Sequence, residues 1–258
     1  MQERHRNRLL YFNEQAETTE KYVIPYIEQV FPLHEGVRVL EIGCGEGGNL
    51  KPFLDRGYHC TGIDLNKGQI ENAKVFLADH PHLDRLTLIA EDIYKITPTE
   101  YDRIILRDVI EHIHNQEQFM AFLKRFIAPG GVVFFGFPAW QMPFGGHQQI
   151  CHSKVLSHLP FFHLLSRPLY AFILRKAGEP PAIVDELLSI KSTRCPIELF
   201  ERLAHEVGLV TLNRRFYFIN PHYEIKFHLR PRRLWSVVGA IPWVRNFFTT
   251  SCFYILKG

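Results

Sequence analysis

A cluster of glycines and an acid near residue 40 has the residue types of a nucleotide-binding loop. The apolar run 37–42, which contains Glu41, leads directly into Gly43, Gly45 and Gly47. Glycines let the backbone turn tightly and approach a ligand where a Cβ atom would clash. A buried strand followed by such a loop and a helix is typical of doubly wound nucleotide folds, although the pattern alone is common. It predicts a nucleotide-cofactor site without identifying the cofactor.

A second acid, Asp64, narrows the choice of cofactor. Residues 60–64 read as a strand that ends in this carboxylate, roughly 20 residues after the loop, where doubly wound folds place an acid that binds ribose hydroxyls. Glu41 and Glu46 would repel a pyrophosphate, whereas the cationic amino-acid end of S-adenosylmethionine would be attracted to them. The residues therefore favour S-adenosylmethionine over a dinucleotide.

The motifs of this region resemble those of the class I S-adenosylmethionine-dependent methyltransferases of the small-molecule type. Five segments follow the order of the family's motifs: VLEIGCGEGG (39–48), GIDLN (62–66), AEDI (90–93), YDRIILRDVIEHI (101–113) and FLKRFIAPGGVVFFGFP (122–138). They cover residues 36–138 well and the remainder only loosely. The resemblance implies S-adenosylmethionine as cofactor and S-adenosylhomocysteine as product.

The resemblance also implies roles at the cofactor. The three loop glycines would allow the close turn, and Glu41 would hold the loop or, through a water, the methionine amino group. Asp64 would accept both ribose hydroxyls, because a carboxylate can take two charge-assisted bonds at once. The further cofactor-binding positions are Leu65, Asp92 at the adenine amino group, Ile93 at the adenine ring face, and Arg107.

Histidines supply the candidate proton acceptors. Methyl transfer is an in-line displacement, so the protein must align the acceptor and, for a hydroxyl, remove its proton. His147 follows a Gly-Gly pair in an aromatic segment and is our first candidate; His112, expected near the carboxyl end of the fourth strand, is the second. For His147, a loop histidine bonded to backbone is an alternative of equal weight.

The acceptor is predicted to be a hydroxyl of a small, lipid-linked, glycan or quinone-like molecule, since the insertions are rich in aromatic residues. Residues 106–109, Leu-Arg-Asp-Val, lack the Asn/Asp-Pro-Pro-aromatic pattern of many N-methyltransferases of nucleic acids and glutamine. Two other interpretations stay open: N-methylation of an amine, such as a phospholipid head group or a small metabolite, and a non-catalytic scaffold subunit that binds the cofactor.

A metal site is the alternative interpretation of one motif. Asp108, Glu111 and His112 resemble the acid–two–acid–His arrangement of ubiquinone-pathway O-methyltransferases, in which the corresponding residues can bind a divalent cation. A Glu-His pair is also widespread in methyltransferases without metal, where the glutamate caps or pairs locally. We therefore expect no metal here.

The elements needed to position these residues predict an α/β fold: a Rossmann-like, doubly wound sheet of seven strands, mostly parallel with the last strand antiparallel, and a helical and aromatic cap. Leading helices over residues 3–30 would bring Tyr11 or Tyr22 to the ligand or, alternatively, pack them on the sheet. The predicted divisions are residues 1–138 (leading helices and cofactor core), 139–193 (cap insertion) and 194–258 (the rest of the sheet, with a second insertion at about 219–248).

Composition and charge limit the partners and the location. A net charge of +3 gives no reason to expect nucleic-acid binding. Five cysteines without paired spacing, and an N-terminus without a secretory signal, favour a cytoplasmic protein. The apolar, basic segments 159–176 and 230–247 leave two interpretations open: helices that cover the sheet, or a surface for peripheral membrane contact. The sequence does not predict the oligomeric state.

Overall fold

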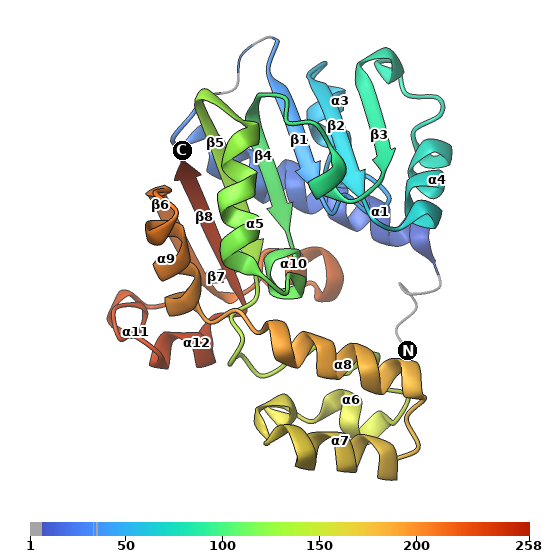
Figure 1. Ribbon diagram of the computed structural model, residues 1–258, viewed down its shortest axis with the longest axis vertical. Coiled ribbons are helices and arrows are strands. Elements are labelled where there is room, and N and C mark those ends of the chain that lie inside the picture. Colours follow the sequence, from blue (N-terminus) through green and yellow to red (C-terminus); the bar gives the residue numbers. More distant parts are fainter. Residues whose placement is uncertain (1–6, 33, 35) are drawn as a thin grey trace.

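A single twisted sheet with helices on both faces forms the body of the protein (Figure 1). The computed structural model describes residues 7–32, 34 and 36–258. The sheet order is β3-β2-β1-β4-β5-β8-β6-β7. The strands are β1 (Arg38–Ile42), β2 (His59–Asp64), β3 (Leu86–Ala90), β4 (Tyr101–Arg107), β5 (Ile127–Phe137), β6 (Val210–Ile219), β7 (Arg232–Arg233) and β8 (Ser251–Lys257).

The predicted fold class is confirmed, with a small difference in the strand count. Strands β1 to β5 pair in parallel, and β8 runs antiparallel to both β5 and β6. The additional eighth strand, β7, has only two residues and pairs with the end of β6 at Tyr217 and Ile219. Two residues are too few to show the alternation of apolar and polar side chains that predicts a strand, so the sequence predicts seven strands and not eight.

Two layers of helices cover the sheet. The helices are α1 (Arg8–Thr18), α2 (Ile24–Glu28), α3 (Lys51–Asp55), α4 (Lys67–Phe76), α5 (Gln116–Leu123), α6 (Lys154–His158), α7 (Arg167–Lys176), α8 (Pro181–Thr193), α9 (Ile197–Glu206), α10 (His222–Phe227), α11 (Ser236–Gly239) and α12 (Val244–Phe248). A π-helical turn, Thr19–Val23, joins α1 to α2. Apolar residues of α5 and α9 pack on one face of the sheet, and those of α2, α3 and α4 pack on the other.

Strand β1 lies at the centre of this arrangement and is buried on both faces. Leu40 and Ile42 belong to the core on one side of the sheet, and Val37 and Val39 to the core on the other. Successive side chains of a strand point to opposite faces, which explains the nearly continuous apolar run in the sequence. Strands β2 and β4 flank β1, so the direction of the chain connections reverses here and leaves a crevice at the carboxyl ends of the strands.

The segment 139–193 forms the helices α6, α7 and α8, which lie below the sheet in Figure 1. Its apolar side chains, including Tyr170, Leu174 and Leu187, form a separate small core. The end of α8 is tied to the body of the protein, because Gln116 donates a hydrogen bond to the carbonyl of Thr193 (2.7 Å) and the hydroxyl of Thr193 donates to the carbonyl of Glu111.

The segment 219–248 contains α10, β7, α11 and α12. Helix α10 packs against α1: Thr18 and His222 are hydrogen-bonded (2.9 Å), and Lys21 and Tyr22 both contact Glu224. Residues from the two ends of the chain thus meet beside the crevice. The division into core, cap and second insertion stays a prediction.

Some element boundaries differ from the predicted ones. The sequence predicts that the fifth strand begins at residue 132, but β5 begins at Ile127 and contains the Pro-Gly-Gly segment, where its register with β4 shifts between Tyr101 and Arg103. The sequence predicts crossover helices over residues 49–56 and 67–80; the observed helices are shorter, at Lys51–Asp55 and Lys67–Phe76. Residues 3–6 of the predicted leading helix lie outside the described residues. Among those described, no helix has the length and apolarity needed to cross a bilayer.

The packing of α9 on the sheet yields a stability prediction. Phe200 is 1% exposed, and its ring lies 5.0 Å from that of Phe135 and 4.7 Å from those of Phe137 and Tyr254. Phe200→Ala should lower the free energy of unfolding by about 3–5 kcal/mol in urea titrations, because it removes a buried ring and leaves a cavity. Phe218→Ala, at a 49% exposed site, should cost less than about 1 kcal/mol. Equal losses in the two variants would contradict this packing.

Candidate active site

A cleft of about 740 Å³ opens at the carboxyl ends of the central strands. The predicted site residues that line it are Gly43, Gly45, Asp64, Leu65, Asp92, Ile93, Arg107 and His112. Three others, Glu41, Gly47 and His147, lie outside this lining. The cleft therefore brings together residues from four separate strand ends.

The glycine loop has a backbone that side chains would disturb. Gly43 has φ +72°, and a Cβ atom there would come within 2.6 Å of Val109 Cγ2. Gly45 has φ +54°. The amide of Gly45 donates to Asp64 Oδ2 (2.8 Å), so the loop and the acid after β2 are locked to each other. The loop thus leaves a cradle for a ligand and places Asp64 at its edge.

The walls of the cleft suit the parts of an adenosine. Asp64 offers a carboxylate whose other oxygen accepts from the amide of Asn66 (2.7 Å), which fixes its orientation. Further along the cleft, Ile93 and the 76% exposed Leu65 provide apolar surface, and Asp92 provides a carboxylate that accepts from the amide of Tyr94. The carboxylate of Asp64 fits the hydroxyls of a ribose, and the apolar surface further along the cleft fits an adenine ring.

Glu41 and Gly47 shape the loop from behind. Glu41 is fully buried and accepts a hydrogen bond from Asn49 (2.7 Å), whose Oδ1 accepts in turn from Arg107 (2.8 Å). Burial raises the pKa of Glu41 to about 8. Gly47, at φ +80°, accepts from the amides of Leu50 and Lys51 and so turns the chain toward α3. Glu41 is thus linked through Asn49 to Arg107, and both roles expected for it at the cofactor stay predictions.

Helix α1 closes one side of the cleft. Arg8 donates two hydrogen bonds of 2.6 Å to Glu46, whose carboxylate is 1% exposed, and Tyr11 lines the cleft beside them. Burial, followed by the charge of Asp108, raises the pKa of Tyr11 to about 12, so it remains a neutral phenol. Tyr22, the other tyrosine considered, contacts Glu224 instead.

Asp108 lies where the cleft meets a second, smaller cavity of about 200 Å³. It has φ +57°, unusual for a residue with a side chain, and strained backbone of this kind gathers at functional sites. The second cavity is lined by cap residues, including Met142, Phe144 and His147, and by Asn220, Tyr223 and Lys226 of the second insertion. The space beside the cofactor cleft is therefore built from both insertions.

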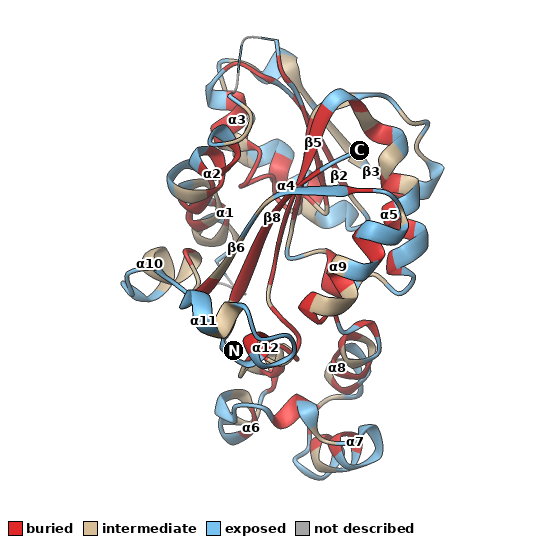
Figure 2. Ribbon diagram, turned by 90° about the vertical axis from the view of Figure 1, so that its left-hand side faces the viewer, coloured by how far each residue is buried: buried red, intermediate tan, exposed pale blue. Residues whose placement is uncertain are grey.

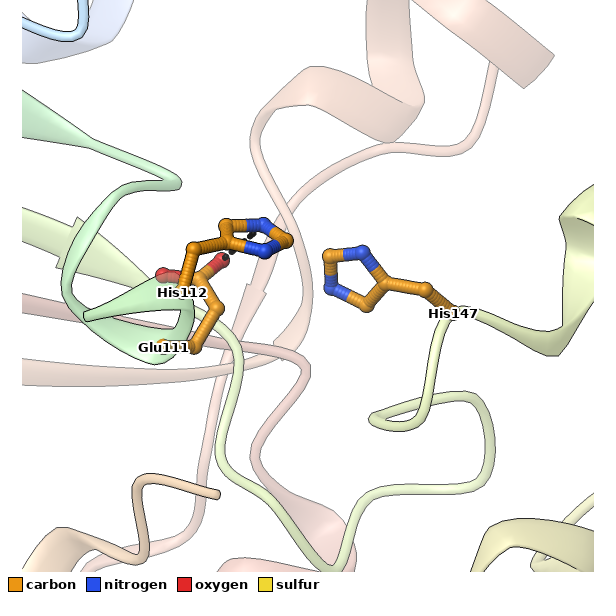
Figure 3. Close-up of side chains that lie close together, drawn as sticks. All are labelled: Glu111, His112 and His147. Carbon is orange, nitrogen blue, oxygen red and sulfur yellow. Dashed lines mark ion pairs between the residues drawn. The ribbon is translucent and has the colours of Figure 1, made fainter. Parts of the chain in front are cut away.

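His112 and His147 face each other at this junction (Figure 3). Their ring centroids are 5.0 Å apart with an interplanar angle of 77°. Burial lowers the pKa of both rings, to about 3 for His147, while the charge of Asp108 acts in the opposite direction on His112. Both are neutral at pH 7. Of the other histidines near the strand ends, His114 also lines the cleft. His152 lies outside it, and its backbone amide donates a hydrogen bond to Glu179.

Glu111 completes a group that could hold a metal ion. Glu111, His112 and His147 each offer one ligand atom, and these atoms lie within 4.8 Å of one another (Figure 3). The Glu111 carboxyl is 4% exposed; Oε1 lies 4.0 Å from His112 Nε2, and within the described part of the chain neither oxygen has a hydrogen-bond partner. Burial, with the charge of Asp108, raises its pKa well above the ordinary value, so a metal would have to displace its proton. The expected absence of a metal stays a prediction.

Sequence reasoning missed several residues of this site. Asp108 was considered only as a metal ligand, although its place directly after β4 marks it as a ligand-facing position. Tyr223 and Lys226 had no signal, because they come from the second insertion and reach the site only through the contacts of α10 with α1. The meeting of His147 with His112 likewise depends on long-range packing.

Comparison with known proteins identifies the family. The family model described as "Methyltransferase domain" matches residues 12–164, more than half of the chain. The chain is similar to the ubiquinone biosynthesis O-methyltransferases of Maricaulis maris, with 31% identity over 100 residues, 38% of this chain and 39% of that one, and of Mesorhizobium japonicum, with 34% over 101 residues, 39% and 40%. It spans less than half the length of these relatives.

Solved methyltransferases share the fold. The plantazolicin methyltransferase BamL in complex with SAH has a TM-score of 0.59 at 14% identity, over 98% of this chain and 88% of that one. The glycopeptide N-methyltransferase MtfA complexed with sinefungin has a TM-score of 0.55 at 12% identity, over 93% and 86%. The glycine cradle, Asp64 and the apolar end of the cleft fit the ligand that the motifs predict. The chain belongs to the class I S-adenosylmethionine-dependent methyltransferases, with S-adenosylmethionine as its cofactor.

Proposed function

We propose that this chain transfers a methyl group to a hydroxyl of a quinone-like or other ring-bearing small molecule. The observation that carries the proposal is the junction at Asp108, where the cofactor cleft opens into the smaller cavity beside two neutral imidazoles. Relatives named ubiquinone biosynthesis O-methyltransferase support an oxygen acceptor. The cavity of about 200 Å³ accommodates a ring but not a long chain, so any lipid tail would extend outside it.

In this proposal the cleft binds the cofactor through the residues that line it. Asp64 accepts the ribose hydroxyls, Asp92 and Ile93 meet the adenine, and Arg107 and the glycine loop lie beside the amino-acid end. When bound, S-adenosylmethionine supplies an electrophilic methyl group on a positively charged sulfur. The contribution of the protein is then to place the acceptor oxygen in line with that methyl group and to exclude water.

His112 is our choice for the group that takes the hydroxyl proton. His112 lines the cofactor cleft. The charge of Asp108, which partly opposes the lowering of the His112 pKa by burial, would stabilise the imidazolium that forms. His147 lies in the second cavity, where a neutral ring with a pKa of about 3 is a weak base but a suitable hydrogen-bond partner for the acceptor. This assignment reverses the order of the two histidines given by the sequence; what supports it is that His112, and not His147, lines the cofactor cleft.

We propose a cytoplasmic location, for which the supporting observation is that all five cysteines are buried, free thiols. Proteins of oxidising compartments more often pair their cysteines. The test is to isolate the protein from its native source under acid, which stops thiol oxidation, and then to denature it and label its thiols. Five free thiols are expected. Oxidised cysteines in that preparation would contradict the assignment.

The acceptor class can be tested directly. Purified protein with S-adenosylmethionine should methylate hydroxylated rings such as catechols and hydroquinones, detected as products by mass spectrometry, at rates unchanged by a chelator. Methylation only of amines would favour the N-methyltransferase alternative. Cofactor binding without turnover on any acceptor would favour the scaffold alternative, and rescue of turnover by added metal would contradict the metal-free mechanism.

The cofactor site is tested by calorimetric titration with S-adenosylhomocysteine. Asp64→Asn should weaken binding by about ten- to a hundred-fold, because a charge-assisted hydrogen bond contributes about 1.5–3 kcal/mol. Asp79→Asn, the same exchange at an exposed position, should bind like wild type. Unchanged binding by Asp64→Asn would remove Asp64 from the site.

The roles of the two histidines can be separated by steady-state kinetics. His112→Gln should lower kcat by about 100-fold or more and retain cofactor binding, since general-base catalysis contributes ~10²–10⁴-fold. His147→Gln should chiefly raise KM for the acceptor. The wild-type rate should fall as pH drops through a pKa below 6.5, because burial lowers the pKa of His112 and only its neutral form accepts a proton. A large kcat loss in His147→Gln alone would restore His147 as the base.

A further inference from the structure

We propose that a groove between the cap and the second insertion, away from the cofactor cleft, is a docking site for the anionic phospholipids of a membrane surface. The groove has a volume of about 800 Å³. Its walls come from α8, α9, α12 and the segment around Trp140 and Leu164. None of its lining residues belongs to the cofactor cleft or to the acceptor cavity.

Large apolar side chains stand exposed at the mouth of this groove. Trp243 is 57% exposed, Phe247 40% and Leu164 36%. Phe161 of the cap, 41% exposed, lies with its ring 6.2 Å from that of Phe247, so the two insertions present one continuous apolar edge. Helices α11 and α12 follow along the chain, and except for the buried Arg245 and Asn246 their residues are exposed or half-buried (Figure 2). A contiguous apolar patch of this kind marks a contact with another apolar phase.

The exposed tryptophans suit an interface between water and lipid. Besides Trp243, Trp235 at the start of α11 is 81% exposed, and Val237 in the next turn is 74% exposed. Amphipathic indole rings are favoured at the head-group level of a bilayer. The described helices cannot span a bilayer, so the contact would be peripheral.

Three cationic side chains lie in the same groove, of which Lys191 donates to the carbonyl of His163 (2.6 Å) and lies over the ring of Trp140. Lys191, Arg194 and Arg202 line it. The guanidinium groups of Arg194 and Arg202 have neither a hydrogen bond nor an ion pair within the described part of the chain. Burial and the nearby charges of Arg194 and Arg167 lower the pKa of Lys191, which indicates crowded cations. Such a cluster beside an apolar edge is complementary to a lipid phosphate with its acyl chains.

The acidic residue in the groove does not neutralise these cations. Glu198 accepts hydrogen bonds from Arg245 Nε (2.9 Å), Asn246 Nδ2 (2.6 Å) and the amide of Trp243 (2.8 Å). These bonds hold the start of α12 against α9 and fix the direction of Trp243, which has φ +65°. The groove is therefore already shaped without a ligand.

A short segment separates this groove from the acceptor cavity. Trp140 and Gln141 line the groove, whereas Pro138 and Met142, on either side of them in the chain, line the cavity. A membrane seated at the groove would lie close to the acceptor cavity, where the tail of a lipid-linked acceptor would have to emerge. The docking site itself is independent of the acceptor proposed above.

Sedimentation with lipid vesicles tests the docking site without any turnover assay. The intact chain should bind vesicles of phosphatidylcholine with 30% phosphatidylglycerol and not vesicles of phosphatidylcholine alone. Arg194→Gln/Arg202→Gln should weaken binding about thirty-fold, as expected for two basic residues at an anionic leaflet. Trp243→Ser should weaken it at least ten-fold, because a buried aromatic ring is lost.

Matched controls distinguish this surface from general charge and general apolarity. Lys74→Gln/Lys257→Gln removes the same charge elsewhere, and Val75→Ser removes an apolar side chain that is 71% exposed on α4. Both should bind vesicles like wild type. Loss of binding in these controls, or retention in the groove variants, would overturn the proposal. Self-association of the wild type that Trp243→Ser abolishes, without vesicle binding, would assign the surface to a second copy of the chain and also overturn it.

Discussion

A buried glutamate, Glu41, joins the parts of the protein that form the cofactor cleft. It lies on the central strand and binds Asn49, which also accepts from Thr19 of the leading helical segment and from Arg107 at the end of β4. Burying a carboxyl group is costly unless it is hydrogen-bonded or neutral, and its raised pKa meets the second condition. Glu41 and Asn49 together thus connect β1, the end of the glycine loop, the π-helical turn after α1 and the end of β4.

The cofactor half of the site was predictable because its constraints are local. The left-handed backbone of Gly43 and Gly45 requires glycine, and an acid at the end of the second strand of a doubly wound sheet has a defined position. Asp64 therefore lies in the cleft where the sequence placed it. The same reasoning predicted that β1 is a buried strand, and it lies inside the sheet between β2 and β4.

The acceptor half could not be predicted to the same extent, because its residues meet through packing between distant segments. His147 reaches His112 only when the cap folds back on the turn after β4, through the contacts of Thr193 and Gln116. Tyr223 and Lys226 line the second cavity because their helix, α10, packs against α1. Short elements such as β7 and α11 have too few residues for a periodic pattern. From the sequence, the second insertion could therefore be described only as an apolar, basic segment without predicted helices or strands.

These differences imply that separate parts of the chain form the cofactor cleft and the second cavity. The sheet and its loops bind a cofactor that the whole family shares, and residues 12–164 are enough to recognise it. The walls of the acceptor cavity, by contrast, come from Met142, His147 and the second insertion, whose residues 219–248 lie beyond the matched region. Acceptor choice is therefore expected to depend on side chains that family membership does not define. If the proposed function holds, the small cavity, more than the cofactor motifs, would determine which acceptors are methylated.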